Sequence, residues 1–385
     1  MAYSSRFNFV GTPVLPKEKA DSKRPFCKEI NKTDPKTKRK RKMFSMSFGV
    51  KESDMNMAFV EVFGSEQETI LTMDTDNEKI EIDWGDRLDS DTIEQVANYR
   101  KYTVDLGDDF GGREEFITEY DMILHLKEWL PQYQGKVLVT GQFVREYYAK
   151  NKRYYNRFRV QRVFAVDEDT KSRLSLTLDL FYNKDSIDKS DFDETKKMTL
   201  SAWISQYINK DEGNKFVPIQ LVFSAAKYDL DENDRHKKLF KYKMGYLEVK
   251  NKTMVHIPWD IVLVRGAEEV EFDESMLTDA QKEQIELGIK DIDDFRPRGG
   301  AYGENIEEFR LFDPKLEGDY TEGLIDTEIK FSEFEEDIFV PAEEETLEEA
   351  KEKSKKKSEK KKKQEDEPPF DTDDSDSGID TDDLF

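Results

Sequence analysis

The sequence predicts a mainly β protein with two strand-rich domains and an acidic tail. Segments in which apolar and polar residues alternate recur between residues 7 and 264, and this alternation is typical of strands with one buried face. Polar turn residues separate these segments. Beyond residue 342 the chain is almost wholly charged and polar, so we expect no fold there, because it cannot bury enough apolar area.

Length and charge are compatible with this organisation. The chain has 385 residues, enough for two domains and tails, and a net charge of −24. The excess acid lies in the C-terminal third, so the balanced remainder can carry local basic patches. Three such patches occur, at 36–42, 145–162 and 235–243.

The first domain begins with strands predicted at 7–15, 38–50 and 57–64. In the second of these strands the apolar residues share one face, which we expect to be buried: Phe44, Met46, Phe48 and Val50. Residues 65–118 are acidic, and we interpret them as an insertion that is irregular apart from strands at 69–73 and 79–84.

A helix and a hairpin follow. Thr118 begins a capping pattern, and the helix that it predicts should end at Pro131. Its apolar residues recur at helical spacing: Met122, Ile123, Leu126, Trp129 and Leu130. The hairpin has strands at 137–148 and 154–166 with a turn at 150–152. In its returning strand one face carries Phe158, Val160 and Phe164, and the other carries Tyr155, Arg157, Arg159 and Gln161.

The second domain is again strand-rich. Strands are predicted at 174–182, 198–208, 216–228, 239–249 and 255–264; a helix also fits 198–208. Residues 231–234 are predicted to be a hairpin turn, after which Lys241 and Lys243 alternate with aromatic residues. An OB-like barrel is one of several small β folds that suit this pattern. A capped helix is expected from Thr278 to Leu287, and beyond about 291 the chain is acidic with isolated aromatic residues.

The order of parts in the first domain resembles the OB fold of bacterial and phage single-stranded DNA-binding proteins. The matching stretches are 10–15, 44–50, 59–64 and 135–141 running on to Tyr148, and the acidic tail ending in Phe is also similar. The resemblance implies an OB barrel that binds DNA without catalysis, with Phe63 and Tyr148 as base-stacking residues. Met57 stands where a tryptophan is usual and the tail lacks a proline before its final Phe, which favours a diverged phage replication protein.

These observations give four predicted regions. They are an OB-fold domain over 1–167 with its insertion at about 65–118, a second β-rich domain over 168–272, an acidic helical or irregular segment over 273–341, and a disordered tail over 342–385, first rich in lysine and then acidic.

A site for single-stranded nucleic acid needs basic residues for phosphates and aromatic rings on which bases stack. The candidate nucleic-acid-binding residues are Arg39, Arg41, Lys42, Phe63, Arg145, Tyr147, Tyr148, Lys150, Lys152, Arg153, Tyr154, Tyr155, Arg157, Arg159, Lys241 and Lys243. The alternative for the hairpin is that its tyrosines half-cover the barrel and its charges only solvate it.

The tail is a candidate partner-binding segment. An acidic C-terminal segment that ends in an apolar and an aromatic residue can be bound by a replication protein such as a polymerase, helicase or primase. The residues expected to make this contact are Asp380, Asp382, Asp383, Leu384 and Phe385. The lysine-rich run before them is either a polycation that contacts DNA or a soluble spacer.

Other functions find less support. Cys27 is the only cysteine and the histidines are far apart, so no metal site or cofactor is expected. An acidic group could indicate a metal-dependent nuclease but is more typical of a turn: Asp83, Asp86, Asp89 and Asp91. No membrane span or signal peptide is visible, and we expect a cytoplasmic protein, in the host cytoplasm if phage-encoded.

The favoured interpretation is therefore a non-enzymatic protein that coats single-stranded DNA during replication, recombination or repair and recruits replication proteins through its tail. The alternative is an acidic adaptor or scaffold whose β domains and tail bind proteins. Salt dependence separates the two, because binding to phosphates weakens as salt rises.

Overall fold

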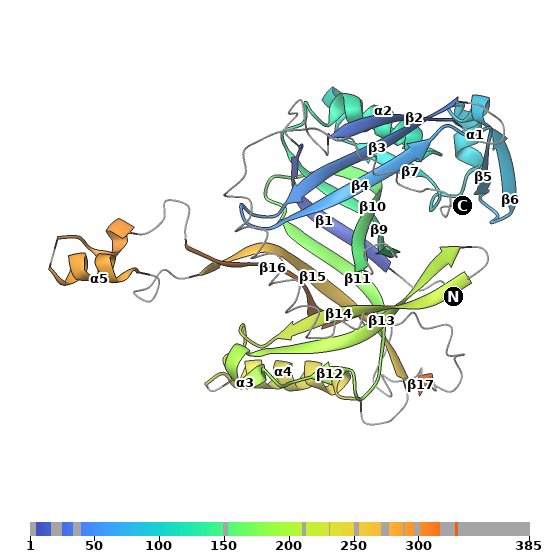
Figure 1. Ribbon diagram of the computed structural model, residues 1–385. Coiled ribbons are helices and arrows are strands. Elements are labelled where there is room, and N and C mark those ends of the chain that lie inside the picture. Colours follow the sequence, from blue (N-terminus) through green and yellow to red (C-terminus); the bar gives the residue numbers. More distant parts are fainter. Residues whose placement is uncertain are drawn as a thin grey trace, which may run out of the picture.

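The computed structural model describes residues 5–16, 25–33, 40–148, 153–209, 213–230, 232–249, 254–270, 277–287, 289–295, 301–315 and 328–329. The protein is mainly β, as predicted: a large mixed sheet of 15 strands is accompanied by a two-stranded sheet (Figure 1). Strands up to residue 166 form what we call the first half, and strands from residue 173 form the second half. No helix within the described ranges is long and apolar enough to cross a membrane.

The described residues of the first half contain ten strands and two α-helices. They are β1 (Ser5–Val14), β2 (Cys27–Thr33), β3 (Lys40–Lys51), β4 (Met57–Ser65), β5 (Thr69–Met73), β6 (Lys79–Asp83), α1 (Ser90–Gln95), β7 (Tyr102–Asp105), β8 (Arg113–Phe116), α2 (Glu119–Trp129), β9 (Lys136–Tyr148) and β10 (Arg153–Val166), with short 3-10 turns at Trp84–Asp86 and Asp108–Phe110.

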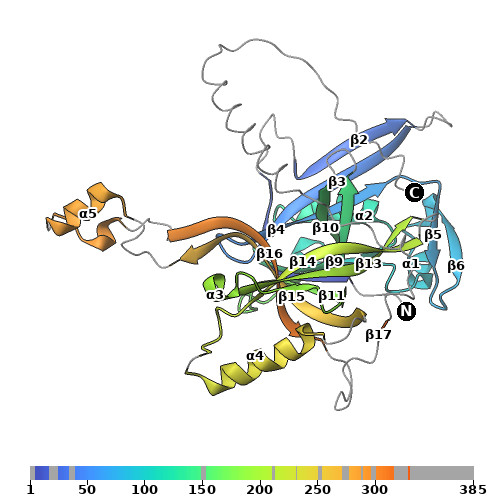
Figure 2. The same ribbon diagram turned by 60° about the horizontal axis from the view of Figure 1, so that its bottom comes forward.

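In the second half, the part of the chain that the structure describes contains seven strands and three α-helices. They are β11 (Arg173–Tyr182), β12 (Ile187–Asp188), α3 (Phe192–Thr195), β13 (Lys197–Asn209), β14 (Gly213–Ser224), α4 (Asp234–Leu247), β15 (Met254–Val270), α5 (Asp279–Glu286), β16 (Ala301–Pro314) and β17 (Glu328–Ile329), with a 3-10 turn at Ile292–Phe295. In Figure 2, α4 lies on the lower side of this half and α5 lies beyond the ends of β15 and β16.

Strand β1 joins the two halves. Its residues 5–10 pair with β11, residues 6–11 pair with β9, and residues 12–14 pair with β3. The buried face of β1 carries Phe7 and Phe9, whose rings pack edge-on against Phe158 of β10 with centroids 5.5 and 4.9 Å apart. Phe143 of β9 in turn contacts Phe309 of β16 at 5.5 Å. One apolar core therefore runs through both halves.

Most strand predictions are confirmed. Strands lie over 7–15, 38–50 and 57–64, over 69–73 and 79–84, and over both arms of the hairpin, within a few residues at each end. The predicted helix is α2, and the Thr118 hydroxyl accepts the Asp121 backbone N–H at 3.2 Å, the N-cap bond that the pattern predicted. Segment 198–208 is strand β13, so the helix alternative is wrong. The helix predicted from Thr278 is α5.

One prediction within the hairpin is wrong. Phe158 and Val160 are buried as expected, but Val163 rather than Phe164 is buried beyond them. The register of β10 against β9 shifts between Val160 and Arg162, which marks a β-bulge. A bulge adds one residue to one strand, so every side chain after it changes face.

The strand predicted over 239–249 is also wrong, because this segment is part of α4. The predicted turn at 231–234 contains the helix N-cap instead: the Asn233 side chain accepts the backbone N–H groups of Arg235 and His236 at 3.0 and 3.2 Å. Phe240, Met244 and Leu247, at helical spacing, pack into the core.

Several strands were not predicted, of which β2 and β16 are long. β2 pairs along β3, and β16 pairs along β15 in the segment expected to be acidic and irregular. The insertion at 65–118 is also more ordered than expected. β5 and β6 form their own sheet around a small apolar cluster that includes Ile70, Ile82 and Val96, whereas β7 and β8 join the main sheet.

Candidate nucleic-acid interface

Strands β3 and β4 present two uncovered aromatic rings. Buried and solvent-facing residues alternate along β4, and Phe59 and Phe63 on the solvent side are 43% and 47% exposed. Their partners across the strand pair on β3 are Gly49 and Ser45. Because these partners are small, no neighbouring side chain on β3 covers the rings. Flat, accessible rings of this kind are suitable for stacking unpaired bases.

The β9–β10 hairpin continues this surface. Tyr148 and Tyr155 lie on the same side of the hairpin, with ring centroids 5.2 Å apart, and each is 38% exposed. Arg157 and Arg159 follow Tyr155 at two-residue intervals and therefore share its side. We call the combined surface the outer face and define it by Phe59, Glu61, Phe63, Glu146, Tyr148, Tyr155, Arg157 and Arg159.

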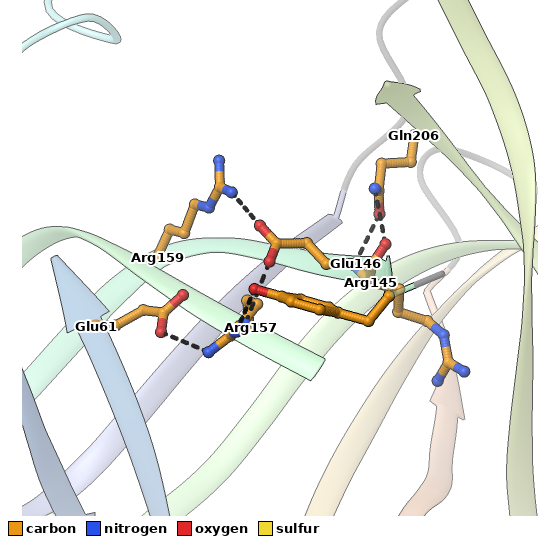
Figure 3. A network of polar contacts seen from close by, with 7 residues as sticks. Glu61, Arg145, Glu146, Arg157, Arg159 and Gln206 are labelled. Atoms are coloured by element: carbon orange, nitrogen blue, oxygen red, sulfur yellow. Dashed lines mark hydrogen bonds and ion pairs between the residues drawn. The ribbon is translucent and has the colours of Figure 1, made fainter. Parts of the chain in front are cut away.

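Both arginines of the outer face are held by carboxylates (Figure 3). Arg157 makes ion pairs with Glu61 at 3.1 Å and with Glu146 at 3.3 Å, and Arg159 pairs with the other oxygen of Glu146. Arg157 also donates to the Tyr148 hydroxyl at 3.5 Å. The outer face is therefore an aromatic surface whose positive charges are already partly neutralised.

Protonation equilibria reflect this network. Burial raises the pKa of Glu61, although Arg157 acts in the opposite direction. Burial would lower the pKa of Arg157, but Glu61 and Glu146 outweigh it, so the pKa of Arg157 is raised. Arg157 therefore stays charged, while Glu61 gives up its charge more easily than an ordinary carboxylate as the pH falls.

Three predicted site residues lie on the opposite side of the hairpin. Tyr147 and Tyr154 pair there, with ring centroids 5.1 Å apart, and the Arg145 guanidinium lies 5.2 Å from the ring centroid of Tyr154. Alternation along both strands separates these residues from Tyr148 and Tyr155. The hairpin residues that the sequence offers for binding nucleic acid therefore divide between two faces.

The opposite side contacts the second half. The Gln206 side chain on β13 accepts the Arg145 backbone N–H at 2.8 Å and donates to the Arg145 carbonyl at 3.0 Å (Figure 3). Arg145 also donates to the Asn156 side chain at 3.1 Å, and Asn156 donates to Glu307 of β16 at 3.2 Å. Arg145 thus belongs to the junction between the halves.

Lys243 is a further correction. Its side chain is buried within the second half, where its ammonium pairs with Asp313 at 2.7 Å and donates to the carbonyl of Phe312. Lys241 and Lys243 do not alternate with aromatic residues along a strand, because both lie on α4, where Lys241 is exposed. The predicted basic and aromatic strand face at 235–243 does not exist.

The basic patch at 36–42 is described only from residue 40, where β3 begins. Lys42 is exposed, and its ammonium lies 3.9 Å from Glu29, while Arg41 is half-buried on β3. Arg153 is exposed at the start of β10. The remaining predicted residues lie outside the described ranges: Arg39, Lys150, Lys152 and the five tail residues Asp380, Asp382, Asp383, Leu384 and Phe385.

Sequence reasoning missed Phe59 and the two acids that hold the arginines. Phe59 is four residues before Phe63 on a strand, so the two-residue period alone places both on one face. Glu61 and Glu146 gave no comparable signal, because they meet Arg157 only through the pairing of three strands. Arg265 of β15 lies with its guanidinium carbon 5.9 Å from the ring centroid of Phe59.

The nuclease alternative finds no metal site. Among the described residues, no three His, Cys, Asp or Glu side chains are grouped so that they could hold a metal ion. Asp89 of the acidic group accepts a hydrogen bond from Thr92 at 3.2 Å, next to the start of α1.

Comparisons with known proteins give a weak likeness to a solved structure. No protein-family model and no curated protein matches the chain. Among solved structures, a deletion mutant of the single-stranded DNA-binding protein from Thermus aquaticus is similar over 68% of this chain and 87% of that chain, with 9% sequence identity and a TM-score of 0.28. A likeness at this TM-score is too weak to carry any property over to the chain.

Proposed function

We propose that this protein binds single-stranded DNA on the outer face. The observation that supports the proposal is the gathering of four exposed rings, Phe59, Phe63, Tyr148 and Tyr155, beside two arginines on one surface. Monomeric proteins seldom leave several large rings uncovered together without a ligand. Unpaired bases fit such rings, because every base has a flat face and stacking needs no particular sequence.

The arginines would bind phosphate by exchanging partners. In the free protein Glu61 and Glu146 occupy the two guanidiniums, so a phosphate has to replace or share a carboxylate. This exchange reduces the electrostatic gain per phosphate, and stacking then supplies a larger share of the binding free energy. A duplex offers phosphates but no accessible base faces, so it should bind weakly.

In this proposal the protein coats single strands during replication, recombination or repair without catalysing a reaction. The acidic segment that ends in Leu384 and Phe385 would recruit a polymerase, helicase or primase, with the aromatic ring in an apolar pocket and the carboxylates facing basic residues.

The direct experiment is a fluorescence anisotropy titration of labelled poly-dT and of a duplex of equal length, each at several salt concentrations. We expect clear preference for the single strand and little dependence on base sequence. The logarithm of the affinity should fall linearly with the logarithm of salt, with a slope near −0.7 per phosphate contacted.

Two results would contradict the proposal. Equal affinity for single strand and duplex would reduce the outer face to an electrostatic patch. No binding of either at low salt would favour the adaptor function, in which the exposed rings contact a protein.

A further inference from the structure

A second exposed ring with basic neighbours lies on the second half, away from the outer face. Phe312 of β16 is 43% exposed. The register of β15 against β16 passes from Asp260 opposite Asp313 to Ile261 opposite Leu311, so Phe312 is the extra residue of a β-bulge. Bulges redirect side chains, and this one places a large apolar ring in solvent beside the buried Leu311.

Two cationic side chains lie close to the Phe312 ring. The guanidinium carbon of Arg173 lies 4.1 Å from the ring centroid of Phe312, and the ammonium of Lys243 lies 5.1 Å from it. Burial would lower the pKa of Lys243, but hydrogen bonds with Asp313 and Tyr228 outweigh it, so the pKa is raised and the ammonium stays charged. The ring is thus held in a positive environment.

Arg173 connects the ring with further positive charge around Glu52. Lys171, Arg173 and Lys227 all act electrostatically on Glu52, whose pKa burial nevertheless raises. Lys171 and Lys227 are exposed. Within the described part of the chain, none of these three cations makes an ion pair with a carboxylate, in contrast to Arg157 and Arg159 of the outer face. We call Phe312, Arg173, Lys171 and Lys227 the Phe312 site.

An exposed strand face connects the Phe312 site with the outer face. Arg159 pairs with Gln142, Gln142 with Arg6, and Arg6 with Thr177, so these side chains project from the same side of four adjacent strands. Arg173 is four residues before Thr177 on β11 and shares that side. Arg6 and Gln142 are exposed, and the row from Arg159 to Thr177 spans only three strand spacings of ~4.8 Å each.

We propose that the Phe312 site is a second subsite for single-stranded nucleic acid, so that one strand contacts both halves of the protein. A base stacks on the exposed part of the Phe312 ring, and Arg173, Lys171 and Lys227 bind the adjoining phosphates. The charge supports this occupant, because Arg173, Lys171 and Lys227 act on the half-buried Glu52, while the nearby Asp313 is paired with Lys243 and Asp260 accepts from Thr177. The inference rests on the proposed function and adds a second binding site for the same nucleic-acid strand.

The test compares a short and a long oligo-dT, of ~8 and ~30 nucleotides, because single OB folds cover ~4–16 nucleotides. The variant is Phe312→Ala in the full chain, with Phe312→Tyr as the conservative replacement. Tyr242→Ala is the matched control, since Tyr242 is an aromatic residue of α4 that is 49% exposed. Thermal unfolding of each variant monitors the fold.

We expect Phe312→Ala to weaken binding of the long oligonucleotide about tenfold while binding of the short one changes little. Phe312→Tyr and Tyr242→Ala should bind both like the unmodified protein. Lys171→Ala combined with Lys227→Ala should flatten the salt slope for the long oligonucleotide by about one unit. The charge-matched pair Lys238→Ala on α4 and Lys282→Ala on α5, both exposed, should leave that slope unchanged.

Unchanged binding of the long oligonucleotide by folded Phe312→Ala would overturn the inference, even if Phe63→Ala or Tyr148→Ala reduces binding and so supports the outer face. An equal loss for both lengths would also overturn it, because the ring would then act on the first site. If the unmodified protein binds neither oligonucleotide, the proposed function itself fails.

Discussion

Glu146 is the residue that restrains the positive charge of the outer face, because it pairs with both Arg157 and Arg159. Glu146→Gln removes this negative charge and keeps the shape of the side chain. We expect several-fold tighter binding of poly-dT at low salt and a steeper decline with salt, since both guanidiniums then bind phosphate more freely. Anisotropy titrations at several salt concentrations measure both effects.

The control for this variant is Glu81→Gln, which removes the same charge from an exposed position on β6. It should change the affinity far less, because only distant, screened charge is lost. If Glu146→Gln binds poly-dT no more tightly than Glu81→Gln, the carboxylate does not compete with phosphate.

Tyr148 tests the stacking contribution of the hairpin. Tyr148→Ala should weaken binding of poly-dT about tenfold at an unchanged fold, because base stacking on one ring is worth ~1–3 kcal/mol. Tyr148→Phe keeps the ring and loses only the hydroxyl that accepts from Arg157, so it should bind nearly normally. Equal losses in both variants would show that the hydroxyl, and not the ring, matters.

For individual residues, the sequence predicted the type of side chain at the candidate site better than the place of each side chain in the fold. Alternation places Phe63, Tyr148, Tyr155, Arg157 and Arg159 on the solvent side of their strands, and the pairing of β4 with β10 brings them to one surface. Lys243 looks identical to an exposed lysine in the sequence, and only the packing of α4 against β16 shows that Asp313 and a carbonyl bind it.

Among the elements, the contact between β9 and β13 is unusual because a side chain replaces a strand partner. Gln206 makes two hydrogen bonds to the backbone of Arg145, as a neighbouring strand would. Gln206→Ala leaves these backbone groups without this partner, so we expect a loss of ~1–3 kcal/mol in the free energy of unfolding, measured by urea denaturation.

Gln220→Ala on the adjacent strand β14 is the matched control, because Gln220 is exposed. It should change stability by less than ~0.5 kcal/mol. A Gln206→Ala protein as stable as the control would mean that the two hydrogen bonds do not hold the halves together.

The elements that the sequence mispredicted share a physical cause. In α4 a short basic and aromatic alternation masks a longer helical spacing, and Asn233 can serve in either a turn or a helix cap. In β16 and β10 a bulge breaks the two-residue period: it places apolar Phe312 next to apolar Leu311, and it moves Val163 into the position expected for Phe164. Long-range pairing, which local pattern does not encode, decides where the two bulges fall.

Charges are distributed unevenly along the chain. The described body carries the basic and aromatic surfaces, and the excess of acid follows in the C-terminal third. The same order was visible in the sequence, whereas the joining of both halves by β1 was not, because pairing of residues 5–10 with β11 leaves no local pattern. A nucleic-acid strand that crosses both halves would therefore contact one continuous sheet.

Removing residues 365–385 tests whether this appendage regulates binding. Its negative charge should be attracted to basic groups of the body and so compete with DNA, over a Debye length of ~10 Å at ~0.1 M salt. We expect the truncated protein to bind poly-dT more tightly at low salt, with the difference vanishing at high salt, and to lose recruitment of replication proteins in pull-down assays. Phe385→Ala keeps every charge of the acidic side chains, so it should lose recruitment but bind DNA normally. A truncated protein that keeps both its DNA affinity and its partners would reduce the acidic segment to a solubilising extension.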